Sequence, residues 1–365
     1  MQSAVVSIAL SIVQSATACS ALMPVRYRPF GTFRFGLAML VVAQHFQHLL
    51  GLDDRALFDR MGFGAIAVAI FFIVSGFVVT EANAVYYVGR PWAFLENRLI
   101  RLVPPYLAAL ALAVAVQAAL WRAGALALWD YPHAGAPLTA PRLLAGMLGL
   151  VPGLHVLLPD DFEFIPFAWS LRMEMAFYGV VTLVLVGARK WPHAVGLGVM
   201  AGLLASLAFL RQGRPGMLSC APMFLLGVAF CLAVRERGIA HKILLAASLP
   251  MAALGFASWG QHGHPVLRLQ FLALGPLLVL LCTLATNRIT DRWHWLDRQL
   301  GDLSYPLYLN HYVVGITLTG VSTMRGGTIY CFGLFSSVCL AVCMGALVDG
   351  RLLAVRNRLR QAVLF

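Results

Sequence analysis

The sequence predicts an all-α protein, a polytopic membrane helical bundle of about ten transmembrane helices. Apolar residues make up 60% of its 365 residues and charged residues only 12%, and the mean hydropathy is +0.81. Soluble domains contain about 45–50% apolar and about 25% charged residues. A single water-soluble core cannot bury such an excess. The structural unit is therefore expected to be a helix of about 20 apolar residues that crosses a bilayer.

Ten apolar runs are candidates for such spans, and the positions of Lys and Arg predict how they are arranged, because short cytoplasmic loops are enriched in both. With ten spans and a cytoplasmic N-terminus, 18 basic residues lie inside and 8 outside, and Arg172 lies within a span. If an eleventh run, 143–158, also crossed, the counts would become 10 and 16. We therefore expect both termini in the cytoplasm and 143–158 as a re-entrant or interfacial segment. The ten runs cover residues 35–52, 62–84, 102–121, 167–188, 193–210, 217–234, 243–260, 266–286, 304–322 and 327–348.

Composition divides the chain into three parts. Residues 1–22 are apolar with no preceding basic segment, so they make a weak signal peptide and are interpreted as an N-terminal extension or a start-site artefact. Residues 23–350 form the membrane domain, and residues 351–365 form a basic cytoplasmic tail. The net charge of +12 is a topology signal rather than a nucleic-acid-binding face. The 7 cysteines include no Cys-x-x-Cys pair, so neither a disulfide framework nor a metal site is expected.

Two ionisable residues stand out in the first span, where such groups are costly and mark functional sites by default. Arg34 and His45 are eleven residues apart. On a helix this is about 1100° and about 16 Å, so both point the same way and His45 lies near mid-membrane. A histidine there can act as a general base or nucleophile. A structural histidine bonded to a neighbouring helix, with Arg34 as an interface anchor, would fit the same pattern.

Three more charges accompany the next spans. Arg98 and Arg101, in the loop after the second span, are three residues apart and hence share one helical face, which the topology places in the cytoplasm. Their guanidinium groups suit phosphate oxygens, although an isolated pair would also fit anchors beside anionic lipid. Glu174 lies inside the fourth span, so its carboxylate needs a partner, which we expect on another helix.

Polar and small residues recur in two other spans. Ser304, Tyr308 and His311 are spaced three to four residues apart, so they form one polar stripe that starts at the cytoplasmic face of the ninth span. In the second span, Ser75 and Gly76 are small enough to let another helix approach closely.

Together these segments resemble the acyltransferase-3 family of bacterial integral-membrane O-acyltransferases, over about residues 33 to 348. The resemblance implies an acyl-CoA donor, usually acetyl-CoA, used as a co-substrate with no permanently bound cofactor. It also implies an acceptor hydroxyl on a glycan or another envelope component. The motifs that carry it are Arg34-x10-His45, the Phe-Phe-x-x-Ser-Gly-Phe run at 71–77, Arg98-x-x-Arg101 before Pro104, the Trp-Ser-Leu-x-x-Glu-x-x-Phe-Tyr run at 169–178 and the Ser-Tyr-x-x-Tyr-Leu-x-His run at 304–311.

The resemblance assigns His45 as catalytic and Arg98 and Arg101 as CoA-binding. We expect Arg34 to stabilise developing oxyanion charge or hold the donor, and Glu174 to orient the imidazole or the sugar. We expect His311 to line the donor tunnel. The expected set is thus His45, Arg34 and Glu174 as catalytic residues, and Arg98, Arg101, Ser304, Tyr308 and His311 as acyl-CoA-binding residues.

The functional hypothesis is transfer of an acetyl group from acetyl-CoA to a hydroxyl of a secreted or cell-surface polysaccharide, or of its lipid-linked precursor. The enzyme would be a multi-pass protein of the bacterial inner membrane. Expected partners are the donor, the glycan acceptor, membrane lipids and polysaccharide assembly proteins, with no nucleic acid. The alternatives are a glycan transporter or export component without CoA-dependent catalysis, an O-acyltransferase acting on a small molecule, a lipid or peptidoglycan, and an enzyme with a succinyl donor.

Overall fold

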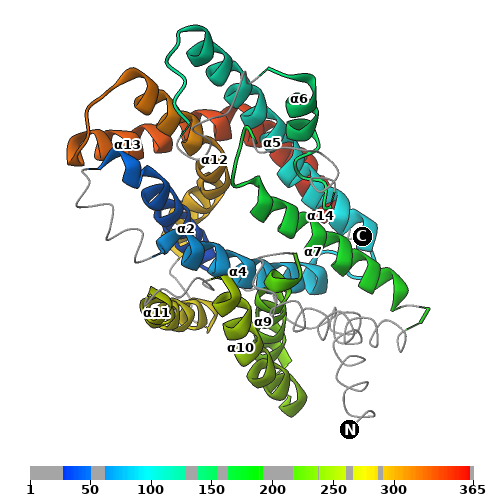
Figure 1. Cartoon of the computed structure of the whole chain (residues 1–365). Coiled ribbons are helices and arrows are strands. Elements are labelled where there is room, and N and C mark those ends of the chain that lie inside the picture. The colour runs from blue at the N-terminus through cyan, green and yellow to red at the C-terminus, as the bar shows by residue number, and fades with distance from the viewer. Residues whose placement is uncertain are drawn as a thin grey trace.

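The computed structural model describes residues 28–50, 62–128, 138–153, 163–188, 190–191, 217–236, 238–259, 266–286 and 291–361. Every regular element in these ranges is a helix (Figure 1). The expected extension, residues 1–22, and the fifth expected span, 193–210, lie outside the described residues. The helices are α2 (Phe30–His45), the short 3₁₀ helix η1 (Phe46–Leu49), α4 (Phe63–Val85), α5 (Pro91–Arg122), α6 (Ala140–Met147), α7 (Ala168–Gly187), α9 (Met217–Glu236), α10 (Ile239–Trp259), α11 (Val266–Thr286), α12 (Asp291–Val321), α13 (Gly327–Met344), η3 (Gly345–Asp349) and α14 (Gly350–Gln361).

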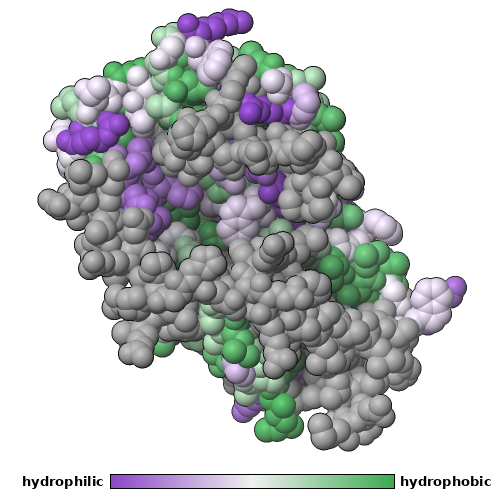
Figure 2. All heavy atoms as spheres, in the orientation of Figure 1, coloured by the Kyte–Doolittle hydropathy of each residue, from purple (hydrophilic) through white to green (hydrophobic). Residues whose placement is uncertain are grey.

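Four stretches of helix in the described part are long and apolar enough to cross a membrane: Phe63–Val85, Pro91–Arg122, Ala168–Gly187 and Gly327–Arg360. Three shorter apolar helices, Cys220–Arg235, His241–Ala257 and Leu274–Thr286, accompany them. Large apolar side chains are exposed on these helices: Leu183 and Phe335 are each 68% exposed. Figure 2 shows green, hydrophobic residues on the outer surface, as expected for a surface that faces lipid. The count of ten spans stays a prediction.

The helix boundaries differ from the expected spans at two places that matter for the site. Arg98 and Arg101 do not lie in a loop: α5 begins at Pro91, so both are on its first three turns. A proline at the first position favours helix initiation, because its missing N–H would have no partner there in any case. Likewise α12 begins at Asp291, well before the expected start at 304. Both helices therefore extend past the apolar run, and their polar ends can meet.

The short helix α6 overlaps the start of the segment 143–158, which was expected not to cross. It has eight residues, or about 12 Å, against a hydrocarbon core of about 30 Å. The chain then turns at 148–153. Residues 154–162 lie outside the described residues, so the path of the whole segment stays a prediction.

The core forms around α2 and α4, which cross the middle of Figure 1. Helix α2 packs against α4 and α12, α4 packs against α9, and α12 packs against α5 and α13. The expected close approach at Gly76 is confirmed, because a Cβ added there would lie 2.1 Å from the backbone oxygen of Phe224 on α9. On α9, Gly227 approaches the backbone of Ile73 in the same way. Because each helix has a glycine at this crossing, the two backbones come into contact.

The described part of the C-terminal segment is helical and packs against α5. Helices α13, η3 and α14 follow one another without a break from Gly327 to Gln361, with a π-helical turn at Gly345–Asp349. Helix α14 packs against α5, and the Asn97 side-chain amide donates to the carbonyl oxygen of Arg356 at 3.0 Å. The expected boundary at 350/351 therefore falls inside a continuous helix that returns to the site.

Candidate active site

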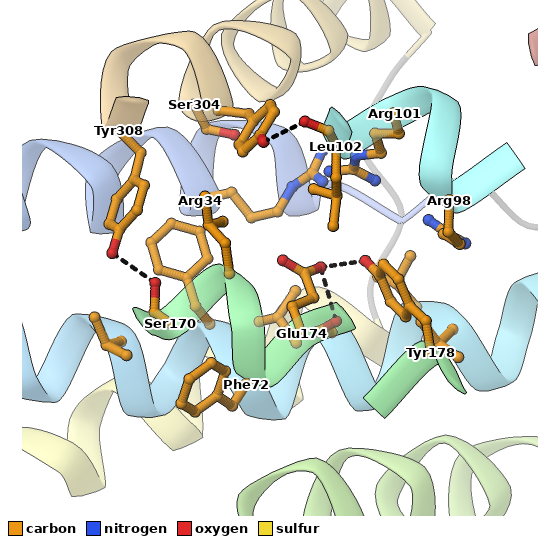
Figure 3. Close-up of a pocket in the computed structure, with 18 residues that line it drawn as sticks. Arg34, Phe72, Arg98, Arg101, Leu102, Ser170, Glu174, Tyr178, Ser304 and Tyr308 are labelled. Atoms are coloured by element: carbon orange, nitrogen blue, oxygen red, sulfur yellow. Dashed lines mark hydrogen bonds between the residues drawn. The ribbon is translucent and has the colours of Figure 1, made fainter. Parts of the chain in front are cut away.

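A cavity lies where α2, α4, α5, α7 and α12 converge (Figure 3). Counted with the solvent-open space at its mouth, it has an empty volume of about 780 Å³. Its walls are mixed, with mainly aromatic and aliphatic side chains on α4, charged side chains on α2, α5 and α7, and hydroxyl groups on α12. Six of the eight expected site residues line it: Arg34, Arg98, Arg101, Glu174, Ser304 and Tyr308.

Arg34 reaches this cavity because the start of α2 is fixed to α12. Asp297, which is 4% exposed, accepts hydrogen bonds from the backbone N–H groups of Gly31 at 3.0 Å and Thr32 at 2.7 Å. A carboxylate at a helix N-terminus satisfies unpaired donors and interacts favourably with the helix dipole. Beside it, a Cβ added to Gly301 would lie 2.8 Å from Arg34 Nη2. Glycine at 301 therefore leaves the space that the guanidinium occupies.

Arg98 is a buried cation on α5. Its side chain is 3% exposed, and its guanidinium lies 5.4 Å from the Phe94 ring centre and 5.7 Å from the Tyr178 ring centre. Its Nε has no hydrogen-bond partner among the described residues. Neither Arg98 nor Arg101 forms an ion pair at contact distance with another described residue. Buried cations without a carboxylate partner are costly unless an anion binds.

Sequence reasoning missed the contribution of α14. Arg356 is half-buried, its Nε has no hydrogen-bond partner in the part of the chain that is described, and its charge interacts with those of Arg98, Arg101 and Arg360. These arginines looked like topology signals because nothing local distinguishes them from other basic residues in a cytoplasmic tail. Only the packing of α14 against α5 brings the charge of Arg356 near those of Arg98 and Arg101.

Glu174 points into the cavity toward Arg34 and Arg101 in Figure 3. It accepts hydrogen bonds from Ser75 Oγ on α4, at 3.2 Å, and from the Tyr178 hydroxyl on its own helix. The expected partner on another helix is therefore found, together with a second partner one turn along α7. The negative charge of Glu174 interacts favourably with both arginines without forming an ion pair at contact distance.

The remaining two expected residues, His45 and His311, contact each other. His45 Nδ1 lies 2.7 Å from His311 Nε2, and His311 Nδ1 lies 2.8 Å from the carbonyl oxygen of Tyr308. The side-chain partner of the His45 imidazole is thus His311, whereas Glu174 bonds elsewhere. His45 is half-buried and His311 is 0% exposed.

The polar stripe on α12 connects the two parts of the site. Ser304 and Tyr308 line the cavity, and His311 lies one turn further along. The Tyr308 hydroxyl is 2.7 Å from Ser170 Oγ and donates to the carbonyl oxygen of Phe167 at 3.1 Å. The Phe167 ring in turn stacks on His45 and His311, with centroid distances of 5.3 and 4.5 Å. One turn of α12 and the Phe167 contacts thus connect the wall of the charged cavity with the histidine pair.

Comparison with known proteins identifies the family. A family model described as an acyltransferase domain (acyltransferase-3) matches residues 31–346. The chain belongs to the acyltransferase-3 family. This confirms the resemblance that the motifs carried, over nearly the same residues.

Two curated relatives support the assignment to the acyltransferase-3 family. The chain is 32% identical over 264 residues to the exopolysaccharide production protein ExoZ of Rhizobium meliloti strain 1021, which covers 68% of this chain and 75% of that protein. It is 25% identical over 354 residues to nodulation protein 10 of Rhizobium leguminosarum bv. viciae, which covers 90% and 94%. No solved structure gives a significant match.

Family membership and composition together make the chain a membrane acyltransferase. The family match contains all eight expected site residues and ends before Arg356.

Proposed function

We propose that this protein transfers an acyl group, in the simplest case acetyl, from acyl-CoA to a hydroxyl of a secreted or cell-surface polysaccharide or of its lipid-linked precursor. The observation that carries the proposal is the cavity lined by Arg34, Arg98 and Arg101, with the histidine pair one turn of α12 beyond its lining residue Tyr308. Such a site combines an anion-binding end with a basic group in an apolar surrounding.

The donor follows from the charges. Acyl-CoA carries a diphosphate and a 3′-phosphate, and guanidinium groups bind phosphate oxygens through paired, charge-assisted hydrogen bonds. The Arg98 Nε, buried and without a partner among the described residues, is a donor in need of such an acceptor. Arg101 and Arg356 add positive charge at the same end. The acyl-pantetheine arm then follows Ser304 and Tyr308 toward His45.

The chemistry assigned to His45 is removal of the proton from the acceptor hydroxyl. The hydroxyl oxygen attacks the thioester carbonyl, a carbon–oxygen bond forms, and the carbon–sulfur bond breaks. The proton taken up by the imidazole then passes to the departing CoA thiolate, so charge and protons balance. A second route, in which the imidazole first accepts the acyl group and then passes it to the hydroxyl, uses the same nitrogen. In either route Arg34 stabilises negative charge on the thioester side.

The acceptor is proposed from the relatives. One of them is named for exopolysaccharide production. His45 is proposed to lie near mid-membrane. A carbohydrate hydroxyl that enters from the outer end of the bundle could therefore reach His45. We place the enzyme in the bacterial inner membrane, with polysaccharide assembly proteins as partners.

The test uses purified protein in liposomes with acetyl-CoA radiolabelled in the acetyl group and an envelope-glycan extract. The wild type is compared with His45→Ala and with a control, His241→Ala, which changes a buried histidine on α10 outside the cavity. Label transferred by the wild type and the control, but not by folded His45→Ala, supports the proposal. Equal transfer by His45→Ala refutes the role of His45. No transfer by any protein, with acetyl and succinyl donors and several acceptors supplied, favours the transporter instead.

A further inference from the structure

The two imidazoles of the histidine pair are joined edge to edge. Their nitrogens are 2.7 Å apart, their planes differ by 20° and their centroids are 5.0 Å apart. The distance between the ring centroids equals the N···N distance plus the distances from the two nitrogens to their own ring centroids. This is the result expected when the hydrogen bond lies in the planes of both rings. The contact is therefore a linear N–H···N hydrogen bond rather than face-to-face stacking.

Backbone carbonyls determine where the proton of His311 lies. His311 Nδ1 is 2.8 Å from the Tyr308 oxygen and 3.3 Å from the Leu307 oxygen, both one turn earlier on α12. A carbonyl oxygen can only accept, so Nδ1 carries the hydrogen. In a neutral imidazole the other nitrogen, Nε2, then carries the lone pair. His311 therefore presents an acceptor to His45.

The proton of His45 follows from that of His311. Because Nε2 of His311 accepts, Nδ1 of His45 must donate, and Nε2 of His45 is left with its lone pair. Two neutral rings satisfy this pattern. A charged imidazole is disfavoured here, because His311 is 0% exposed and no carboxylate bonds to either ring among the described residues.

We propose that His311 is a positioning residue, which holds His45 in the Nδ1–H tautomer and leaves Nε2 of His45 as the atom that reacts. This inference rests on the proposed function of His45. It replaces the expectation that His311 lines the donor tunnel: the imidazole of His311 is fully enclosed, and both of its nitrogens are already hydrogen-bonded. His45 is half-buried, so it is the more exposed member of the pair.

The arrangement has a clear chemical use. Both routes of acyl transfer need a lone pair on the reacting nitrogen, and the opposite tautomer would place a hydrogen there. The chain from the Tyr308 carbonyl through His311 to His45 orients the ring in the way that a third group orients the base of a catalytic triad. Phe167, stacked on both rings, restricts their rotation from one side.

The kinetic test compares two variants of His311. Glutamine places an amide oxygen at the same number of bonds from Cβ as Nε2, so His311→Gln keeps an acceptor for His45. His311→Leu has a similar size and no acceptor. We expect His311→Leu to lower kcat about 100-fold or more with the KM for acetyl-CoA within about threefold of the wild type. His311→Gln is expected to stay within about tenfold in kcat, and His241→Gln is the matched control.

Two kinetic results would overturn the inference. One is a His311→Gln protein that is folded and as impaired as His311→Leu. The other is a rise in the KM for acetyl-CoA with kcat unchanged, which is the signature of a donor-tunnel residue.

A spectroscopic test reads the tautomer of His45 directly. Nitrogen-15 shifts of histidine-labelled wild-type protein distinguish protonated from unprotonated ring nitrogens, and the His45 signals are assigned by their loss in His45→Ala. We expect a protonated Nδ1 and an unprotonated Nε2 in the wild type, and a larger population of the opposite tautomer in His311→Leu. A protonated Nε2 in an active wild type refutes the inference. The expected tautomer without acyl transfer from any donor would instead overturn the proposed function, and with it the catalytic use of the pair.

Discussion

The crossing of α4 and α9 provides a strong test of the packing that shapes the cavity. At Gly227 an added Cβ would lie 1.9 Å from the carbonyl oxygen of Ile73 and 2.8 Å from the backbone nitrogen of Phe77. Because both obstacles are backbone atoms, no side chain can rotate to make room. Gly227→Ala must therefore separate the helices by more than about 1 Å, and forced overpacking of this kind costs about 3 kcal/mol. Since Phe72 and Ser75 on α4 line the cavity, acyl transfer is expected to fall as well.

The assay is thermal denaturation of the purified protein in detergent. We expect Gly227→Ala to lower Tm by about 5 °C or more. The matched control is Gly179→Ala on α7, where nothing lies within 4 Å of the added Cβ. That variant is expected to keep or slightly raise Tm, because alanine favours the helix by about 1 kcal/mol over glycine. A Tm of Gly227→Ala within about 1 °C of the wild type would show that α4 and α9 do not pack in this way.

Three other substitutions test the charged end of the site. Arg356→Gln is expected to raise the KM for acetyl-CoA about tenfold with kcat little changed, because it removes one cation from the proposed phosphate site. Arg358→Gln, on the exposed face of the same helix, should leave KM unchanged, and equal effects of the two substitutions on KM would contradict the reasoning. Glu174→Gln is expected to lower Tm, because Arg34 and Arg101 lose a nearby negative charge. Added CoA should raise the Tm of this variant by more than that of the wild type, and equal rises in Tm would place the CoA phosphates elsewhere. Asp297→Ala removes the acceptor of two backbone N–H groups of α2 and is expected to lower the free energy of unfolding by about 1–2 kcal/mol. Asp297→Asn keeps one acceptor and should lose less. Identical denaturation curves for the wild type and Asp297→Ala would show that Asp297 does not cap α2.

Local features of the chain were readable from the sequence because they depend on periodicity. The spacing of Ser304, Tyr308 and His311 predicted one polar stripe, and the structure places the first two on the cavity and the third one turn beyond. The small pair Ser75 and Gly76 predicted a close helix approach, and Gly76 makes one. Both inferences rest on helical geometry over a few residues, which is the range in which sequence fixes direction.

Other expectations failed where polar helix ends continue beyond the apolar run. Arg98 and Arg101 were assigned to a loop because hydropathy falls there, yet α5 begins at Pro91 and carries them on its first turns. Hydropathy reports the length of chain that fits in a bilayer and is blind to helix that extends past it. Hydropathy likewise gave no sign that α14 continues the helical run beyond residue 350 and packs against α5, while the division into a membrane domain and a tail stays a prediction.

The sequence by itself determined the helical class, the family and six residues that line one cavity. The tertiary structure decided which of them bond to one another. His45 and His311 are 266 residues apart, and Arg356 lies 259 residues beyond the Asn97 amide that holds its backbone. Helical periodicity states which way a side chain points, but it does not state which helix stands opposite. The neighbouring helix is decided by backbone packing at contacts such as Gly31 with Gly301 and Gly76 with Phe224. At these contacts glycine has no side chain, so the partner backbone can approach closely.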